Sequence, residues 1–319
     1  MSVQSSERPR QLMAVMYHYV RPLANSAFPR LKALELSDFL SQLDYLQEHH
    51  TILSVADFSA ILADCMPLPD RACVLTFDDG YSDHYRHVFP HLVDRRLEAF
   101  FFAPKSSLID RHILEVNRIQ FTLASHSHPE AMADEIDALI VANGVDPAPL
   151  RARHFAPNRF DGPEVAYVKR LLQNVLPAAL RSDLTAALFA QHVTDDEVGF
   201  ADDLYLSAEQ AREMRALGME FGGHGDLHLW HGLSNPDELS REVSGSVQAL
   251  QAIGAPVEGG FYCYPYGNVT QAVHDAVSGA GFRTGFTVEP ALWNADGDPL
   301  SISRLDTNDL PQRSKVDLL

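Results

Sequence analysis

The chain has 319 residues, which is longer than one average domain and suits a single α/β barrel that carries an insertion. Its hydrophobic content of 46% and charged content of 21% are ordinary for a globular protein with a sizeable core. The formal net charge of −18 argues against duplex nucleic acid and anionic membrane surfaces as partners.

Cysteine content and the start of the sequence bear on the cellular compartment. Three scattered cysteines are too few for a disulfide framework or a thiolate zinc site. The first residues, MSVQSSERPRQ, lack the long apolar segment of a signal peptide, and no apolar run approaches a membrane span. We therefore expect a reduced, cytoplasmic protein without a membrane span, and its oligomeric state is left open.

Apolar runs alternate along the chain with amphipathic segments. In chain order they predict a strand at 12–20, a helix at 37–49 capped by Ser37, a strand at 72–77, a helix at 85–96, a strand at 98–103, a helix at 207–217, a strand at 219–221, a helix at 236–252, a strand at 260–264, a helix at 271–280, and strands at 284–288 and 300–304. This alternation implies a parallel sheet with its chemistry at the carboxyl ends of the strands.

A segment of about a hundred residues, 105–205, interrupts the alternation. It shows helical spacing and no clear strand, with predicted helices at 113–123, 130–141, 164–176 and 180–191. We interpret it as a helical insertion near the catalytic face of a single domain that spans residues 1–319. It is either a lid over the site or an insertion that only pads the barrel.

Two adjacent carboxylates stand at the end of the second predicted strand. In Thr76–Tyr81 (TFDDGY), Asp78 and Asp79 cannot both point into a packed core, and Gly80 permits a sharp turn. One carboxylate can bind a cation while its neighbour serves as a base. Taken alone, an Asp-Asp-Gly sequence is more often a plain turn.

Two histidines follow a later strand. In Gly222–His228 (GGHGDLH), His224 and His228 are four residues apart and can reach one metal ion, and the flanking glycines favour a loop. His231 is a competing ligand. With 15 histidines in the chain, such a pair can arise by chance. A third motif, Phe261–Gly267 (FYCYPYG), is a strand that runs into a turn able to aim a backbone N–H at a substrate oxygen, although an ordinary strand-end turn has the same pattern.

In this order, the three motifs resemble those of the polysaccharide deacetylase family, the carbohydrate esterases that share the chitooligosaccharide deacetylase domain. The resemblance covers about residues 12–306 apart from the insertion, and Met16–Val20 (MYHYV) resembles a bacterial branch of the family. It implies a distorted (β/α)7-8 barrel with each motif at a strand end.

The resemblance also implies roles for particular residues. The metal ligands correspond to Asp79, His224 and His228, with Zn²⁺ the usual ion. Asp78 corresponds to the catalytic base and the N–H of Tyr266 to the oxyanion donor. From the residues themselves, one carboxylate and two imidazoles suit a divalent ion of intermediate softness.

The sequence departs from the family pattern at three places. Gly225 stands where the family usually has Ser or Thr. Cys263 stands where an Arg often steadies the catalytic Asp. A late Leu-x-His block, whose histidine normally protonates the leaving amine, is missing, and Ser303–Asp309 stands in its place.

Other residues are candidates for the missing roles. His18, at the end of the first strand, is our candidate for the general acid, with a structural histidine as the alternative. Arg304 and Asp306 are predicted to bind substrate or to steady Asp78, with a solvated ion pair as the alternative. The remaining predicted substrate-binding residues are Tyr81, Tyr264 and Pro265.

The sequence therefore predicts a metal-dependent hydrolase that removes an N-acyl group, acetyl or formyl, from an amino sugar. The expected substrate is a nucleotide-linked sugar, a lipid-linked sugar or a nascent glycan in surface-polysaccharide biosynthesis. A catalytically silent relative that binds a metal and a sugar is the main alternative. An unrelated metallohydrolase acting on esters or cyclic amides is a third possibility.

Overall fold

The computed structural model describes residues 10–24, 26–126, 128 and 131–312. The chain forms two compact units, each described by itself. The barrel unit comprises Met1–Arg21, Ala33–Arg111 and Asp202–Leu319, and the helical unit comprises Pro22–Lys32 and His112–Ala201.

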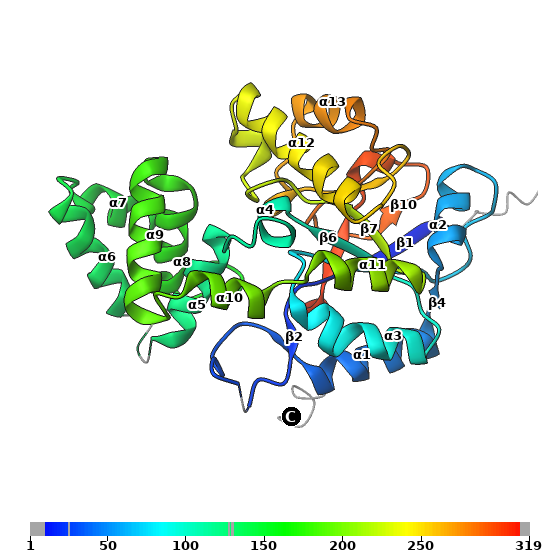
Figure 1. Ribbon diagram of the computed structural model, residues 1–319, viewed down its shortest axis with the longest axis horizontal. Helices are drawn as coiled ribbons and strands as arrows, with labels where there is room; N and C mark the ends of the chain where they lie inside the picture. The colour runs from blue at the N-terminus through cyan, green and yellow to red at the C-terminus, as the bar shows by residue number, and fades with distance from the viewer. Residues whose placement is uncertain (1–9, 25, 127, 129–130, 313–319) are drawn as a thin grey trace, which may run out of the picture. The chain divides into compact units, whose positions relative to one another are not determined.

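A mainly parallel sheet forms the centre of the barrel unit (Figure 1). Its strands follow the spatial order β10-β1-β5-β6-β7-β8-β9, β11 pairs with β1, and β4 pairs with β5. Only β10 is antiparallel to its neighbour among the pairings in the described residues. The strands are β1 (Gln11–Tyr17), β4 (Thr51–Ile52), β5 (Ala72–Phe77), β6 (Phe100–Ala103), β7 (Glu220–Gly223), β8 (Phe261–Cys263), β9 (Thr284–Phe286), β10 (Trp293–Asn294) and β11 (Arg304–Asp306).

The sheet curls back towards its first strand. Phe286 of β9 forms a parallel bridge with Ile302, and the N–H of Thr287 donates to the carbonyl of Ile302 at 2.8 Å. Two residues further along the chain, β11 pairs in parallel with β1. This arrangement is the predicted distorted (β/α) barrel.

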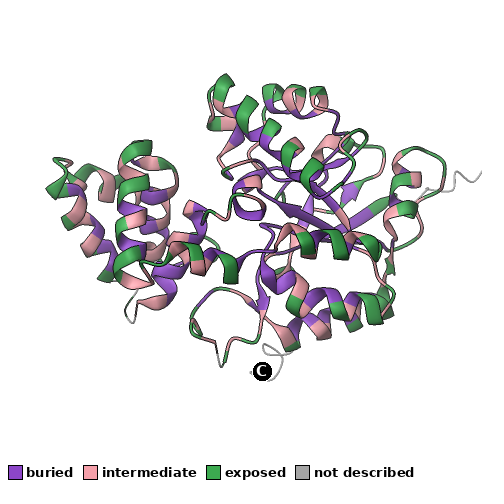
Figure 2. Cartoon of the chain, viewed as in Figure 1, coloured by how far each residue is buried: buried purple, intermediate pink, exposed green. Residues whose placement is uncertain are grey.

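The central strands are buried on both faces, as expected of a parallel sheet covered by helices. All six residues of β5 are buried, and Figure 2 shows the central strands mostly in purple. The β1–β5 register runs from Leu12 opposite Ala72 to Tyr17 opposite Phe77. The residues that follow these two strands therefore emerge together at one end of the barrel.

Helices surround the sheet, and α12 packs beside α13 (Figure 1). The helix α12 begins and ends at the predicted residues, and Asn235 and Glu238 form a capping box at its start. The helices of the barrel unit are α1 (Leu36–His49), α2 (Val55–Leu62), the π-helical turn His84–Val88, α3 (Phe89–Asp94), α4 (Lys105–Leu108), α11 (Ala208–Ala216), α12 (Pro236–Ala252) and α13 (Gln271–Gly279). A separate two-stranded sheet pairs β2 (Val20–Arg21) with β3 (Leu34–Glu35).

Two local predictions were wrong. Ser37 does not cap α1, because the helix begins one residue earlier, with Glu35 at the cap position. The last strand does not cover 300–304. Asp298 accepts a hydrogen bond from the N–H of Leu300 and closes a 3₁₀ turn at Pro299–Ser301, so the strand begins only at Arg304.

The helical unit has a core of its own, which includes Ile136, Leu171 and Leu188. Its helices are α5 (Glu115–Ser125), α6 (Ala131–Ala142), α7 (Pro147–His154), α8 (Pro163–Arg170) with the π-helical turn Leu171–Val175, α9 (Ala178–His192) and α10 (Glu197–Leu204), which runs past the boundary between the units. The helices expected in the segment 105–205 are present. That this segment is an insertion within one domain stays a prediction.

In the part of the chain that the structure describes, every helix is too short or too polar to span a lipid bilayer.

Candidate metal and catalytic site

The chain turns sharply after β5, and the carboxylates of Asp78 and Asp79 lie in this turn. The N–H of Asp78 continues the sheet by donating to the carbonyl of Tyr17 at 2.9 Å. Asp79 (φ 71°) and Gly80 (φ 66°) then adopt the left-handed conformation. A Cβ on Gly80 would lie 2.5 Å from the Cβ of Ala103, so only glycine fits there. The predicted sharp turn is therefore confirmed.

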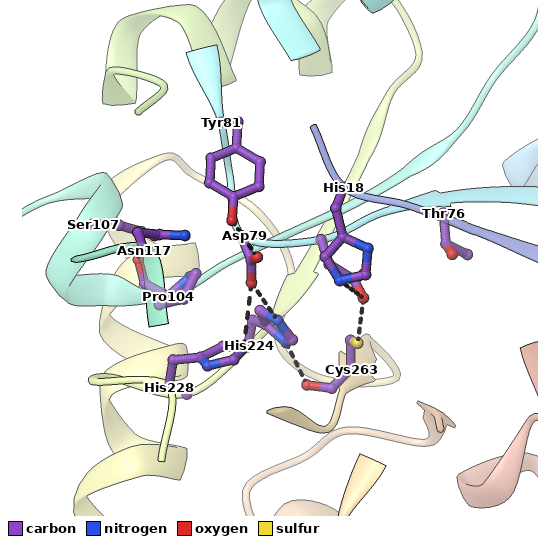
Figure 3. A network of polar contacts seen from close by, with 12 residues as sticks. His18, Thr76, Asp79, Tyr81, Pro104, Ser107, Asn117, His224, His228 and Cys263 are labelled. Carbon is purple, nitrogen blue, oxygen red and sulfur yellow. Dashed lines mark hydrogen bonds and ion pairs between the residues drawn. The ribbon is translucent and has the colours of Figure 1, made fainter. Parts of the chain in front are cut away.

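Asp79, His224 and His228 converge, as Figure 3 shows. The Oδ1 of Asp79 lies 3.2 Å from the Nε2 of His224 and 3.3 Å from the Nε2 of His228. The three side chains are buried, and one ligand atom from each lies within 4.8 Å of the others. The motifs that follow β5 and β7 thus meet at one point.

The orientation of the imidazoles fits a metal site. The Nδ1 of His224 faces the carbonyl oxygen of Cys263 at 2.7 Å, and a proton on Nδ1 leaves the Nε2 lone pair directed at the cluster (Figure 3). Burial lowers the pKa of His228, whereas that of His224 is raised despite its burial, because its acidic neighbours, Asp79 among them, favour the protonated form. Burial opposes ionisation of Asp79, but the imidazoles outweigh it and hold the pKa of this carboxyl well below its usual value. One carboxylate and two imidazoles can therefore receive a divalent cation.

Asp78 is held by a buried guanidinium from β11. The Nη1 and Nη2 of Arg304 donate to its Oδ1 and Oδ2, each at 2.8 Å. Arg304 also donates to the Thr76 hydroxyl (3.0 Å), the Thr287 carbonyl (2.7 Å) and the Cys263 sulfur (3.1 Å), so its five N–H groups are all engaged. Burial alone would raise the pKa of Asp78, but the charge of Arg304 outweighs burial and lowers this pKa to about 2.

This geometry bears on the predicted alternatives for Arg304. The side chain is fully buried, so a solvated ion pair is wrong. Its contacts are those of a residue that steadies Asp78. In the family, an Arg at the position of Cys263 often has this role. A direct contact with substrate stays a prediction.

His18 lies beside Asp78 and is partly exposed. Its Nε2 is 3.8 Å from the Oδ2 of Asp78, and 41% of its side chain is exposed. The imidazole can therefore be reached by a ligand while staying next to the candidate base. A packed structural histidine, the alternative for His18, would be buried.

A second cluster of possible ligands consists of Asp78, His224 and Cys263. Both oxygens of Asp78 already accept hydrogen bonds from Arg304. Burial raises the pKa of the Cys263 thiol, which disfavours the thiolate that a metal needs. The cluster with Asp79 is therefore the better cation site.

Several aromatic candidates lie around the ligands. The hydroxyl of buried Tyr81 donates to the Oδ2 of Asp79 at 2.6 Å, an inward contact that favours support of the ligand over contact with substrate. Tyr266 adopts a left-handed conformation (φ 59°). Its ring stacks on that of Trp230, with 4.2 Å between the ring centroids, and its centroid lies 4.7 Å from that of the His228 ring. The third motif therefore reaches the candidate site.

The remaining candidates have other surroundings. Tyr264 and Pro265 are buried, and Asp306 caps a 3₁₀ turn by accepting from the N–H of Asn308. Substrate binding by these residues stays a prediction. His231 is outside the ligand cluster, because its ring nitrogens face the hydroxyl of Tyr262 (2.6 Å) and the carbonyl of Leu229 (2.9 Å).

A family model, polysaccharide deacetylase, matches residues 66–135 and 161–285, which is well over half of the chain. The chain therefore belongs to the polysaccharide deacetylase family. It is 34% identical over 99 residues to poly-beta-1,6-N-acetyl-D-glucosamine N-deacetylase of Escherichia coli (strain K12). That match covers 31% of this chain but only 14% of the relative, so the chain spans a small part of that protein's length.

Solved structures show the same fold over nearly the whole chain. Streptococcus pyogenes deacetylase PplD, in complex with acetate, superposes with a TM-score of 0.56 at 15% identity and covers 94% of this chain and 93% of its own. IcaB from Ammonifex degensii superposes with a TM-score of 0.55 at 20% identity, covering 92% and 91%. The predicted fold class and family are thus confirmed.

Proposed function

We propose that this chain is a metal-dependent hydrolase that removes the N-acetyl group from an amino sugar of a glycan. The observation that carries the proposal is the pair of adjacent carboxylates with separate surroundings. Asp79 faces two imidazoles, whereas Asp78 is locked by Arg304 and borders exposed His18. Two carboxylates with such different neighbours suit one metal ligand and one base.

The donor set fits a divalent cation, and Zn²⁺ is the ion we propose. When bound, such an ion supplies Lewis acidity, which acidifies water and polarises an amide carbonyl. Asp79, His224 and His228 would hold it.

The other residues move protons and place the substrate. Asp78, kept ionised by Arg304, accepts a proton from the attacking water. His18 donates a proton to the nitrogen of the leaving amine, since its Nε2 is close to Asp78 and open to a ligand. The backbone N–H of Tyr266 is our proposed donor to the oxygen that becomes negative in the transition state.

The main alternative is a silent relative that binds a metal and a sugar. Two departures from the family pattern support this alternative: Cys263 replaces an Arg, and the Leu-x-His block near the end of the sequence is missing. Arg304 contacts Asp78 where the usual Arg is absent, and His18 offers an imidazole. Burying a charged Asp78 with its guanidinium is costly and unnecessary for a binding protein. These contacts therefore favour the enzyme.

The deciding experiment measures acyl release from a panel of N-acetylated and N-formylated glucosamine monomers, oligomers and nucleotide sugars. The zinc-loaded protein is expected to release acetate, and Asp78→Asn to retain zinc but lose about 10²- to 10⁴-fold in rate. Asp296→Asn is the control, because the Asp296 side chain is exposed and forms a surface ion pair with Arg10. Undiminished activity of Asp78→Asn, or no acyl release by the zinc-loaded protein from any substrate, contradicts the proposal.

A further inference from the structure

The loop that carries both candidate histidines lacks regular secondary structure. From His224 to Trp230 the backbone forms neither helix nor strand. Gly225 (φ 81°) and His228 (φ 61°) are both left-handed, and for histidine this conformation is strained. The position of His228 relative to His224 must therefore be imposed by groups outside the loop.

Those groups lie on α12. The buried carboxylate of Glu242 accepts the N–H of Leu227 on Oε1 at 2.9 Å, and the N–H groups of Asp226 and Leu229 on Oε2, both at 3.2 Å. One turn further along the helix, the hydroxyl of Ser246 accepts the N–H of Gly225 at 2.7 Å. Two side chains thus satisfy four backbone donors that flank His228.

The carbonyl groups of the loop are held from another side. The N–H groups of Lys105 and Ser106, at the start of α4, donate to the carbonyls of Gly225 (3.2 Å) and Asp226 (3.1 Å). The Ser106 hydroxyl also donates to the carbonyl of Asp226, at 2.5 Å. The loop is therefore held between two helices.

Gly225 leaves the space that Glu242 occupies. A Cβ at position 225 would lie 2.4 Å from the Oε2 of Glu242 and 3.2 Å from the Cε1 of His231. The absence of a side chain at Gly225, where the family usually has Ser or Thr, therefore makes room for the carboxyl group of Glu242.

We propose that Glu242 is a positioning residue of the metal site: by accepting three N–H groups on either side of His228, it fixes the spacing of the two imidazoles that bind the cation. The inference rests on the proposed function. It assigns a task to a carboxyl side chain that is 1% exposed and lies outside the three sequence motifs.

The test uses Co²⁺ as a spectroscopic probe on the metal-stripped chain of 319 residues. Glu242→Gln keeps the shape of the side chain but places an NH₂ group against backbone donors. We expect it to weaken Co²⁺ affinity by about 10- to 100-fold and to change the visible absorption of the bound ion. Glu258→Gln is the matched control, because Glu258 is 81% exposed and bonds only to Arg283 among the contacts described. Its affinity and spectrum should equal those of the unmodified protein.

Ser246→Ala is the milder variant and decides the matter if Glu242→Gln does not fold. It removes one acceptor and should weaken Co²⁺ binding by about tenfold. Ser244→Ala is its control on the same helix, because the Ser244 hydroxyl is exposed and donates to the carbonyl of Arg241 within α12.

If Glu242 only stabilises the fold, Glu242→Gln will lower the melting temperature of the metal-free protein but leave Co²⁺ affinity and the visible spectrum unchanged. That result overturns the inference. Asp79→Ala separates it from the proposed function. If Asp79→Ala binds Co²⁺ as tightly as the unmodified protein, the metal site itself is wrong. If Asp79→Ala loses Co²⁺ while the Glu242 and Ser246 variants keep it, only the positioning role fails.

Discussion

The guanidinium of Arg304 forms two 2.8 Å hydrogen bonds with the carboxylate of Asp78, across 226 positions of sequence. Because both side chains are buried, neither charge can be left alone without a large cost. We expect Arg304→Met to lower the free energy of unfolding of the metal-free protein by about 3–5 kcal/mol, measured by urea denaturation.

A double-mutant cycle checks the source of that loss. The double variant Asp78→Asn/Arg304→Met no longer buries an unpaired charge. Its loss in free energy of unfolding should therefore be smaller than the sum of the losses of the two single variants. Arg283→Met, which breaks an exposed pair with Glu258, should cost less than about 1 kcal/mol. Additive effects of the Asp78 and Arg304 changes would show that the pair has no net coupling.

The pH dependence of stability follows from the same pair. The pKa of Asp78 in the folded protein is about 2, below the ordinary value of 3.8, despite the opposing effect of burial. The folded state therefore favours the carboxylate, and its contribution is complete above about pH 4 and lost as the pH falls towards 2. The shift corresponds to about 2 kcal/mol.

Urea denaturation of the unmodified protein and of Asp78→Asn, both with chelator, measures this contribution between pH 2 and 6. The difference in unfolding free energy should be constant above about pH 4 and shrink below it. A difference that does not change with pH over this range would contradict the assigned pKa.

His18 is predicted to serve the leaving group. His18→Gln should lower the rate of N-acetyl hydrolysis by about 100-fold and leave zinc content unchanged. Hydrolysis of an aryl acetate should be nearly unaffected, because its phenolate departs without a proton. His49→Gln, on the exposed face of α1, is the control. Equal losses on both substrates would exclude a role restricted to protonation of the amine.

The cluster of Asp79, His224 and His228 could be predicted because its residues follow parallel strands. Asp79 comes after β5 and His224 after β7, and strands of one parallel sheet present their carboxyl ends at the same edge. Arg304 could be predicted only as one of several alternatives. A sequence places it near a strand end but does not tell whether its side chain points outward or into the barrel.

Glu242 was missed although the sequence holds a signal for it. It belongs to the buried face of α12, together with Leu239, Val243 and Ser246, at the spacing of an amphipathic helix. A carboxylate within such a stripe needs buried partners. Those partners are backbone N–H groups of the loop, and side-chain patterns carry no information about them.

The short hydrogen bond from Tyr81 to Asp79 leads to the last prediction. The Tyr81 hydroxyl donates to Oδ2 at 2.6 Å, whereas Oδ1 faces both imidazoles. We therefore predict that this hydroxyl sets which oxygen of Asp79 would bind the proposed cation. Tyr81→Phe keeps the ring, including its stacking on Tyr19, and leaves a buried carboxylate oxygen unpaired. We expect Zn²⁺ affinity, measured by competition with a chelator, to fall by about tenfold. Tyr85→Phe is the matched control, since the Tyr85 hydroxyl bonds to Glu213 at the surface. If Tyr81→Phe binds Zn²⁺ as tightly as Tyr85→Phe, the orientation of Asp79 does not depend on this hydroxyl, and the rigidity of the turn at Asp79 and Gly80 is sufficient by itself.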